Sequence, residues 1–373
     1  MKKFILIILL LFCYTLSFAD VNDTDLRKKI SQMIIVGFNG TEITQDNPIY
    51  NDIKNENISG VILFLKDALK IKNNEKDITK NIKSPKQLKK LIKQIKKLSP
   101  QKLFICIDEE GGQISRLPSS LGFKLKTLSH KQLGDKDDIK LTFKQAKKIA
   151  KKLKKLGINV NFAPCVDLAI NKESDIIYKR ERAFSEDPQI VFKHAQAYIQ
   201  AHNKYNILTV AKHFPGHGSA IGDSHNGFTD VTSTWNKIEL EPYITLDDEG
   251  LLNAVMIAHV FNENLDNEYP ATMSQKIITD ILKKEIGFRG LVITDDMQMK
   301  AISDNYPLED SIITAINAGN DILLFANNLN NDYPDLVKQF NDIVFNAVKN
   351  GKISQDRIEE SYKKITEIKA GLE

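Results

Sequence analysis

Residues 85–108 of this 373-residue chain read PKQLKKLIKQIKKLSPQKLFICID. The first part, 85–98, places apolar residues three and four positions apart with lysines between them, which is typical of an amphipathic helix. The second part, 102–108, is a short apolar run that ends at Asp108. A nearly continuous apolar strand is buried on both faces, as in parallel sheets covered by helices. The segment therefore predicts one helix and strand of an α/β fold, with an acidic residue at the carboxyl end of the strand.

The same alternation runs through the rest of the chain. Short apolar runs predict eight strands, at 32–37, 59–64, 102–108, 159–167, 207–213, 254–260, 290–295 and 321–325. Amphipathic stretches predict helices at 85–98, 137–156, 187–205, 274–285, 308–318 and, closing the chain, 354–370. Eight such units fit a single (β/α)8 barrel, which needs about 250 residues plus loop insertions. An open doubly wound sheet is the alternative, but no strand leads into a glycine turn with dinucleotide-binding spacing.

The charge balance narrows the class of partner. Lys and Arg total 52 against 48 Asp and Glu, a formal net charge of +4. A protein that binds nucleic acid by neutralising phosphates carries a stronger basic bias, so no nucleic-acid partner is expected. Among the basic residues arginine is rare, with Arg27, Arg116, Arg180, Arg182, Arg289 and Arg357 as its members.

The first nineteen residues read as a secretory signal peptide. Two lysines precede an apolar run at 4–12, and Ser-Phe-Ala at 17–19 is a cleavage pattern before Asp20. The apolar run is shorter than the roughly 20 residues that span a bilayer, so an uncleaved anchor is the less favoured interpretation. We expect a periplasmic or secreted domain of residues 20–373 with no stable membrane span, and with 50 basic against 48 acidic residues.

Two cysteines would remain after cleavage, Cys106 and Cys165, each inside an apolar run. The plain interpretation is two buried thiols. A disulfide is the alternative in an oxidising compartment, because each cysteine precedes by two residues an aspartate at a strand end, Asp108 or Asp167, which places both on one face of neighbouring strands.

Ionisable residues follow or end five consecutive expected strands. They are Asp108 and Glu109 at the third strand, Asp167 at the fourth, Lys212 and His213 at the fifth, His259 at the sixth, and Asp295 and Asp296 at the seventh. One such residue often caps the next helix, but burying five sets of charges is costly unless they pair or bind a ligand. Because barrel enzymes build their sites at the carboxyl ends of the strands, these residues predict an active site there.

The densest stretch is KHFPGHG at 212–218, followed by DSH at 223–225. A proline and a glycine separate the first two histidines, so a zinc-binding helix with histidines one turn apart is not expected. The glycines allow the backbone to bend over the barrel mouth, and Asp223 can orient the imidazole of His225. We interpret the stretch as a catalytic loop; the alternative for His217 and His225 is a histidine that only stabilises its own turn.

These motifs resemble glycoside hydrolase family 3, and within it the NagZ-type β-N-acetylglucosaminidases. The histidine stretch is the most specific part of the resemblance, which covers about residues 24–330. Blocks that agree, in the same order, are GVILF at 60–64, DEEGG at 108–112, RAFSEDP at 182–188, GFRG at 287–290 and TDDM at 294–297. The chain departs from the family pattern at Glu109, where Gln is usual, at Ala183 and Ser185, which replace Ser and Gly, and at Thr294, which replaces Ser.

The resemblance implies residue roles and a reaction. Asp295 resembles the nucleophile, His225 the proton-transferring residue and Asp223 the residue that holds it. The residues that match sugar-binding positions are Asp108, Arg116, Arg182, Lys212 and His213. The implied reaction is retaining hydrolysis of a terminal β-linked N-acetylglucosamine from glycans or muropeptides, including peptidoglycan fragments, through a covalent glycosyl-enzyme. No cofactor or metal ion is expected, and the enzyme is expected to be a monomer.

Three alternatives stay open. A phosphorylase is one, because a histidine donor does not repel phosphate as a carboxylate does. A metal-dependent hydrolase would use His213, His217, His259 and Asp295 as ligands. A sugar-binding protein on a decayed barrel would bind glycans without turnover.

Overall fold

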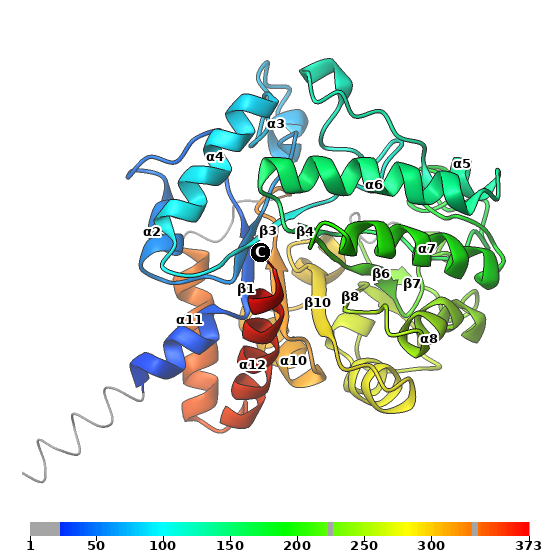
Figure 1. Ribbon diagram of the computed structural model, residues 1–373. Coiled ribbons are helices and arrows are strands. Elements are labelled where there is room, and N and C mark those ends of the chain that lie inside the picture. Colours follow the sequence, from blue (N-terminus) through cyan, green and yellow to red (C-terminus); the bar gives the residue numbers. More distant parts are fainter. Residues whose placement is uncertain (1–22, 223–226, 330–334, 373) are drawn as a thin grey trace, which may run out of the picture.

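The computed structural model describes residues 23–222, 227–329 and 335–372, and its strands form a parallel sheet curved into a barrel (Figure 1). The order of strands in the sheet is β5-β4-β3-β2-β1-β11-β10-β8-β6. The strands are β1 (Ile34–Gly37), β2 (Gly60–Ile62), β3 (Phe104–Ile107), β4 (Val160–Asn161), β5 (Leu208–Thr209), β6 (Ala211–Phe214), β8 (Ala254–Ile257), β10 (Leu291–Asp296) and β11 (Ile322–Phe325). All neighbouring pairs of strands in this sheet are parallel. Each of the eight expected strands contains at least one strand of the sheet.

The barrel closes within the fifth expected strand. The two outermost strands of the sheet, β5 and β6, follow each other in the chain with only Val210 between them. The N–H of Val210 donates to the carbonyl oxygens of Asn161 and Ala163, each at 3.1 Å. Because β5 pairs with β4 and β6 pairs with β8, the expected strand at 207–213 bends from one neighbour to the other. The predicted (β/α)8 barrel is confirmed, with its fifth strand in two parts.

Most of the expected strands are shorter than predicted, and two of them end well before their predicted end. Of 159–167 only β4 is regular, because the N–H of Ala163 turns back to the carbonyl oxygen of Asn161 at 2.8 Å and the next pairing is an isolated bridge between Cys165 and Lys212. The expected strand at 254–260 gives β8 and then β9 (Val260–Phe261), which pairs instead with β7 (Thr229–Asp230) in a separate two-stranded sheet. The carboxyl end of the barrel is therefore irregular at these two positions.

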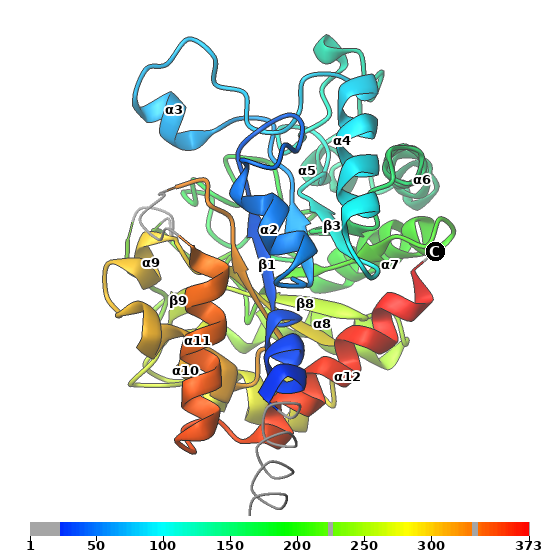
Figure 2. The same ribbon diagram turned by 90° about the vertical axis from the view of Figure 1, so that its left-hand side faces the viewer.

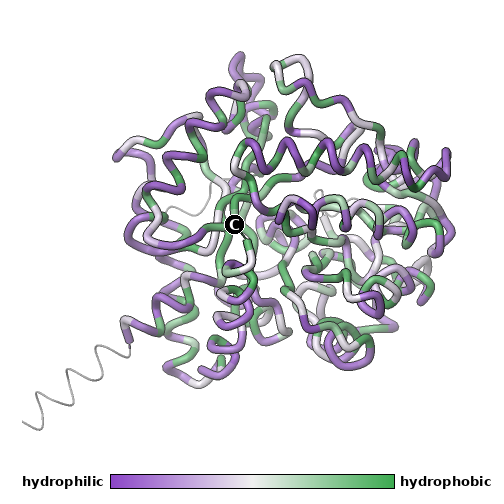
Figure 3. The backbone as a smooth tube through the Cα atoms, in the orientation of Figure 1, coloured by the Kyte–Doolittle hydropathy of each residue, from purple (hydrophilic) through white to green (hydrophobic). Residues whose placement is uncertain are grey.

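Helices cover the outside of the barrel, and hydrophobic positions concentrate on the central strands (Figure 3). The helices are α2 (Pro48–Lys54), α3 (Ala68–Lys72), α4 (Pro85–Leu98), α5 (His130–Gly134), α6 (Ile139–Leu156), α7 (Pro188–Asn203), α8 (Glu241–Asp248), the π-helix η4 (Lys276–Glu285), α9 (Lys300–Ser303), α10 (Leu308–Ala318), α11 (Leu336–Lys349) and α12 (Gln355–Gly371). Helices α6 and α7 lie side by side (Figure 1), as do α10 and α11 (Figure 2). The expected helices at 85–98 and 308–318 match α4 and α10 to the residue.

Helix α4 shows why the prediction succeeds. The hydroxyl of Ser84 accepts a hydrogen bond from the Gln87 N–H and so caps the first turn. The buried residues of the helix are Leu88, Leu91, Ile92 and Ile95, which recur at the three-and-four spacing seen in the sequence. Capping and periodicity are both local, so the sequence contains them in full.

Both cysteines of the expected mature domain are buried, free thiols. The disulfide alternative is therefore wrong. Cys165 instead donates its thiol to Asp167 Oδ2 at 3.1 Å, and burial raises the pKa of both thiols well above the ordinary value.

Within the described ranges no helix has the length and apolar character needed to cross a membrane. The expected signal peptide at 1–19 lies outside the described residues, as do Asp223 and His225.

Candidate active site

The carboxyl ends of the barrel strands surround a cavity of about 730 Å³. Six of the eight residues that the sequence singled out line it, namely Asp108, Arg116, Arg182, Lys212, His213 and Asp295. A volume of this size is ordinary for small-molecule sites, which span roughly 300–1,000 Å³. The fold thus brings together side chains from β6, β10 and the segments that follow β3 and β4, and their individual roles stay predictions.

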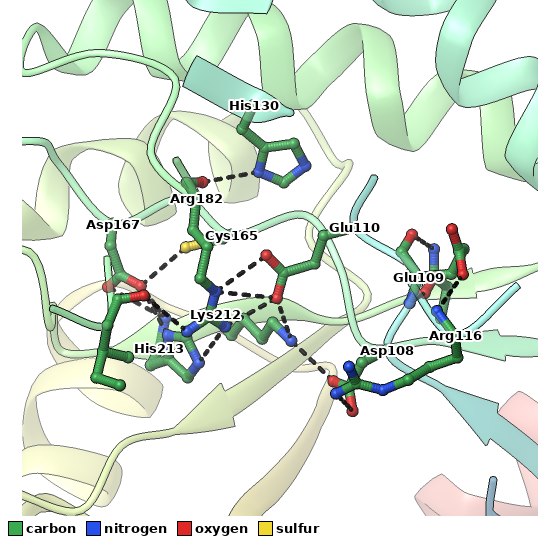
Figure 4. A network of polar contacts seen from close by, with 12 residues as sticks. Asp108, Glu109, Glu110, Arg116, His130, Cys165, Asp167, Arg182, Lys212 and His213 are labelled. Atoms are coloured by element: carbon green, nitrogen blue, oxygen red, sulfur yellow. Dashed lines mark hydrogen bonds and ion pairs between the residues drawn. The ribbon is translucent and has the colours of Figure 1, made fainter. Parts of the chain in front are cut away.

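Lys212 lies at the centre of a buried charge network (Figure 4). Its Nζ lies 2.9 Å from Asp108 Oδ1 and 2.8 Å from Glu110 Oε1. Burial acts to lower the pKa of Lys212, but these two carboxylates outweigh it and raise the pKa. Burial acts to raise the pKa of Asp108, but the positive charges of Lys212 and Arg116 outweigh burial, so the pKa of Asp108 is lowered. Lys212 and Asp108 are therefore charged at neutral pH and can bind sugar hydroxyls by charge-assisted hydrogen bonds.

Arg182 binds Glu110 with two nitrogens (Figure 4). Its Nε donates to Glu110 Oε2 at 3.0 Å and its Nη2 donates to Oε1 at 2.8 Å. Burial opposes ionisation of Glu110, yet Arg182 and Lys212 hold the pKa of that carboxyl well below its usual value. The sequence contained Glu110 in the DEEGG block but assigned it no role, although three successive acidic residues after a buried strand were a usable signal. Glu110 is the group that fixes both Lys212 and Arg182.

His213 links Asp167 to Arg182. Its Nδ1 lies 2.7 Å from Asp167 Oδ2, and the Nη2 of Arg182 lies 3.1 Å from its Nε2. A guanidinium can only donate, so Nε2 accepts and Nδ1 carries the proton that it donates to Asp167. His213 is therefore held between Asp167 and Arg182. The sequence named Asp167 as an acid at a strand end but did not identify its contact with His213.

The ligand set of the metal-dependent alternative does not form. His259 is buried and both ring nitrogens are paired, Nδ1 with Thr272 Oγ1 at 2.6 Å and Nε2 with the Asp296 carbonyl oxygen at 2.9 Å. Among the described residues, one group could hold a cation by proximity, Cys165, Asp167 and His213.

Electrostatics disfavours a metal at that group. The carboxylate of Asp167 already accepts from the thiol of Cys165, from the ring of His213 and from the backbone N–H groups of His213 and His217. The only other ring nitrogen of His213 faces the guanidinium of Arg182. The group serves to fix His213 beside the cavity.

Glu109 is buried behind the cavity and organises the loop after β3. Its Oε2 accepts from the backbone N–H groups of Arg116 at 2.8 Å and Leu117 at 3.1 Å. Its own carbonyl oxygen accepts from the hydroxyl of Tyr198 at 2.8 Å and the amide of Asn161 at 3.0 Å. Glu109 thus positions the backbone of Arg116, and burial raises the pKa of its carboxyl to about 7.

Glu109→Gln, which restores the residue usual in the family, is expected to stabilise the protein at pH 8 and to change little at pH 5. Between about pH 4.5 and 7 the folded state retains a proton on Glu109 that the unfolded state has lost, so the stability falls as the pH rises through that range. An uncharged amide avoids this loss. At pH 8 the variant's free energy of unfolding should therefore exceed that of the unaltered protein by on the order of 1–3 kcal/mol. Urea unfolding at both pH values measures it, and an equal gain at pH 5 and pH 8 would contradict the role assigned to the charge.

Two buried carboxylates, those of Asp167 and Glu239, hold the backbone at 215–220, which leads toward the expected catalytic loop. The N–H of His217 donates to Asp167 Oδ1 at 2.8 Å, and that of Gly218 donates to Glu239 Oε2 at 3.0 Å. Glu239 is buried, and burial raises the pKa of its carboxyl to about 7. No motif pointed to Glu239, because only the tertiary structure brings it to this loop.

Gly218→Ala is expected to lower the free energy of unfolding by about 1–3 kcal/mol. A Cβ at this position would lie 1.8 Å from the carbonyl oxygen of Leu168, so one of two backbone segments has to move. Gly222→Ala is the matched control, since its Cβ would lie 3.3 Å from the Thr229 hydroxyl, a side chain that can rotate. Thermal unfolding compares the two variants, and equal losses would show that the close approach at Gly218 is not the cause.

Comparisons with known proteins agree with the resemblance. A family model described as the N-terminal domain of glycosyl hydrolase family 3 matches residues 25–368. The chain is 32% identical over 339 residues to beta-hexosaminidase A of Pseudoalteromonas piscicida. The matched region covers 86% of this chain and 54% of that protein. It is 32% identical over 282 residues to a beta-hexosaminidase of Tolumonas auensis, which covers 74% of this chain and 78% of that protein.

A solved structure is similar over nearly the whole chain. A glycoside hydrolase family 3 beta-N-acetylglucosaminidase from Paenibacillus sp. str. FPU-7 superposes with a TM-score of 0.80 at 27% identity, over 92% of this chain and 62% of that chain. The chain therefore spans about half of the Pseudoalteromonas protein and less than two thirds of the Paenibacillus one.

Proposed function

Because the chain belongs to glycoside hydrolase family 3, we propose that it is an exo-acting, retaining β-N-acetylglucosaminidase that acts on peptidoglycan fragments. The observation that carries the proposal is the single cavity in which Asp295 and the charged set of Asp108, Arg182 and Lys212 meet. The name of the similar Paenibacillus structure, a beta-N-acetylglucosaminidase, supports N-acetylglucosamine as the sugar removed, and the two similar beta-hexosaminidases support a hexosaminide as the substrate.

In the first step, a carboxylate oxygen of Asp295 attacks the anomeric carbon while the glycosidic bond breaks. His225 gives its proton to the departing oxygen, and a covalent glycosyl-enzyme forms. Asp295 is part of β10, and its Oδ1 accepts from the Asp296 N–H at 2.8 Å, which fixes the carboxylate at the strand end. The hydroxyls of the sugar would bind Lys212 and Asp108, whose positions the buried network holds.

In the second step, water attacks the same carbon and releases Asp295. His225 accepts the proton of that water, so it must be charged for the first step and neutral for the second. An imidazole that titrates near neutrality is suited to both, with Asp223 orienting it. A histidine takes the place of the carboxylic acid that retaining glycosidases usually employ.

Export of the enzyme is part of the proposal. Residues 1–19 carry the charged start, apolar run and cleavage pattern of a signal peptide. An exported enzyme would meet cell-wall glycan, which supplies fragments with N-acetylglucosamine at one end. Cell fractionation with sequencing of the mature N-terminus checks this, with Asp20 as the expected first residue; full-length enzyme in the cytoplasm would contradict it.

The activity itself is tested with the 4-nitrophenyl β-N-acetylglucosaminide and the protein from residue 20 onward. We expect release of nitrophenol that is insensitive to chelator and to phosphate. Stimulation by phosphate would favour the phosphorylase, and loss of turnover with chelator would favour a metal-dependent hydrolase. Binding of the sugar without turnover would leave the sugar-binding protein as the function.

A further inference from the structure

Among the described residues, the exposed rim of the cavity carries two cations. Of the described residues that line the cavity, those with exposed side chains are Lys66, Ile71, Gln113 and Arg180, and none of these four is acidic. Lys66 follows β2 and Arg180 lies in the loop between β4 and α7. Within the described part of the chain neither of these two cations is in an ion pair with a carboxylate.

The cations deeper in the cavity are different, because they are already paired. Arg116 and Lys212 lie 3.5 and 2.9 Å from the carboxylate of Asp108, and Arg182 lies 2.8 Å from that of Glu110. Each of these three cations therefore has a carboxylate partner within the protein. The charge at the rim is not compensated in this way, so it is available to a ligand.

The backbone next to Arg180 is held in place by His130, the first residue of α5, and by Ser129, the residue that caps α5. The carboxylate of Glu181 accepts from the hydroxyl of Ser129 at 2.7 Å, and the carbonyl oxygen of Arg182 lies 2.9 Å from Nδ1 of His130. On the other side of Arg180, the N–H of Lys179 donates to the carbonyl oxygen of Ser174 at 3.0 Å, so the backbone is held both before and after Arg180. The guanidinium on this backbone can bind a carboxylate with two parallel donors.

Arginine is rare in this sequence, yet the cavity lining contains three of the six, Arg116, Arg180 and Arg182. Two of these three have a task within the protein network, and Arg180 is the remaining one. The planar fork of arginine favours bidentate binding of a carboxylate, which the more frequent lysine cannot reproduce. The composition thus agrees with an anionic ligand at the rim.

We propose that Lys66 and Arg180 select leaving groups that carry a carboxylate. The inference rests on the proposed function, which places the N-acetylglucosamine ring beside Asp295 in the depth of the cavity. A cavity of about 730 Å³ holds more than one sugar ring, so the leaving group extends toward the rim. The carboxylate belongs either to an acid substituent of the leaving sugar or to a peptide attached to it.

The test compares three disaccharides with N-acetylglucosamine as the terminal ring. The first has a free acid on the leaving sugar, the second has the same acid as a neutral primary amide, and the third has it joined to a dipeptide with its own terminal carboxylate. We expect kcat/KM for the free acid or the dipeptide to exceed that for the neutral amide about ten-fold at low salt. The preferred substrate of the two identifies the source of the carboxylate, and the preference should decline as salt screens the exposed charges.

Lys66→Gln combined with Arg180→Gln is expected to bring this ratio of kcat/KM values close to one. Lys179→Gln is the matched control, because Lys179 is also exposed but pairs with Glu173 and Asp175 and does not line the cavity. It should leave the ratio at about ten.

Each outcome decides between the two proposals. Hydrolysis of all three substrates at equal rates by the unaltered enzyme would overturn the rim proposal and leave the proposed function intact. A double variant that loses activity on every substrate while keeping the ratio would show a merely structural role and also overturn it. Absence of hydrolysis with all three would overturn the proposed function, and the rim proposal with it.

Discussion

Asp295→Asn is expected to reduce kcat/KM for the 4-nitrophenyl β-N-acetylglucosaminide by at least about a thousand-fold. An amide oxygen is a far weaker nucleophile than a carboxylate, and removing the nucleophile of a covalent mechanism leaves only binding and polar stabilisation. The asparagine oxygen can still accept from the Asp296 N–H, which Asp295 Oδ1 does at 2.8 Å, so the strand end should be preserved. Steady-state kinetics together with thermal unfolding separates the loss of chemistry from a loss of folding.

Thr294→Ser provides the matched control for Asp295→Asn. Thr294 Oγ1 accepts from the N–H of Leu324 at 3.0 Å, and serine, the residue usual in the family, retains that hydroxyl. Its kcat/KM should stay within about two-fold, since the substitution removes one buried methyl group next to the nucleophile. A slow fluorosugar should also leave a covalent adduct on Asp295 that mass spectrometry of the peptides detects. Substantial turnover by Asp295→Asn, or an adduct on another residue, would contradict the assignment.

Arg182→Met is expected to lower the free energy of unfolding by about 3 kcal/mol and to abolish most of the activity. Both groups of this ion pair are buried, and removing one partner leaves the charge of Glu110 poorly compensated. Lys212 remains 2.8 Å from Glu110, which keeps the loss near the lower end of the range for broken buried pairs. Urea unfolding at pH 7 measures the change in stability.

The double variant Arg182→Met with Glu110→Gln tests the origin of that loss. A neutral amide no longer requires the guanidinium, so we expect the double variant to recover at least half of the stability lost in Arg182→Met. Activity should not return, because the sugar-binding donor is still absent. If the single and double variants are equally destabilised, the broken ion pair is not the cause of the lost stability. The cause is then the lost packing of the long arginine side chain.

The sequence predicted the barrel best where the signal was local. Helix α4 matches its expected range because capping at Ser84 and apolar spacing are both written within fourteen residues. The expected strand at 159–167 was too long because an apolar run does not show where the ladder breaks, which is where the N–H of Ala163 turns back to Asn161. The bend at Val210 that closes the barrel was not predictable, since it depends on which neighbours the two halves of one strand find.

For the site, the sequence determined which residue types stand at the strand ends, because strand periodicity and the family motifs are properties of short stretches. It therefore indicated six residues that the tertiary structure places around one cavity, among them Asp295 and Lys212. Only the tertiary structure decided how the charges are paired, for example Glu110 with Arg182 across 72 positions and Asp108 with Lys212 across 104. Coulomb interactions and desolvation depend on distances and burial in space, which no local pattern of residues encodes. The ion pairs deep in the cavity and the exposed cations at its rim therefore emerge only when the chain is folded.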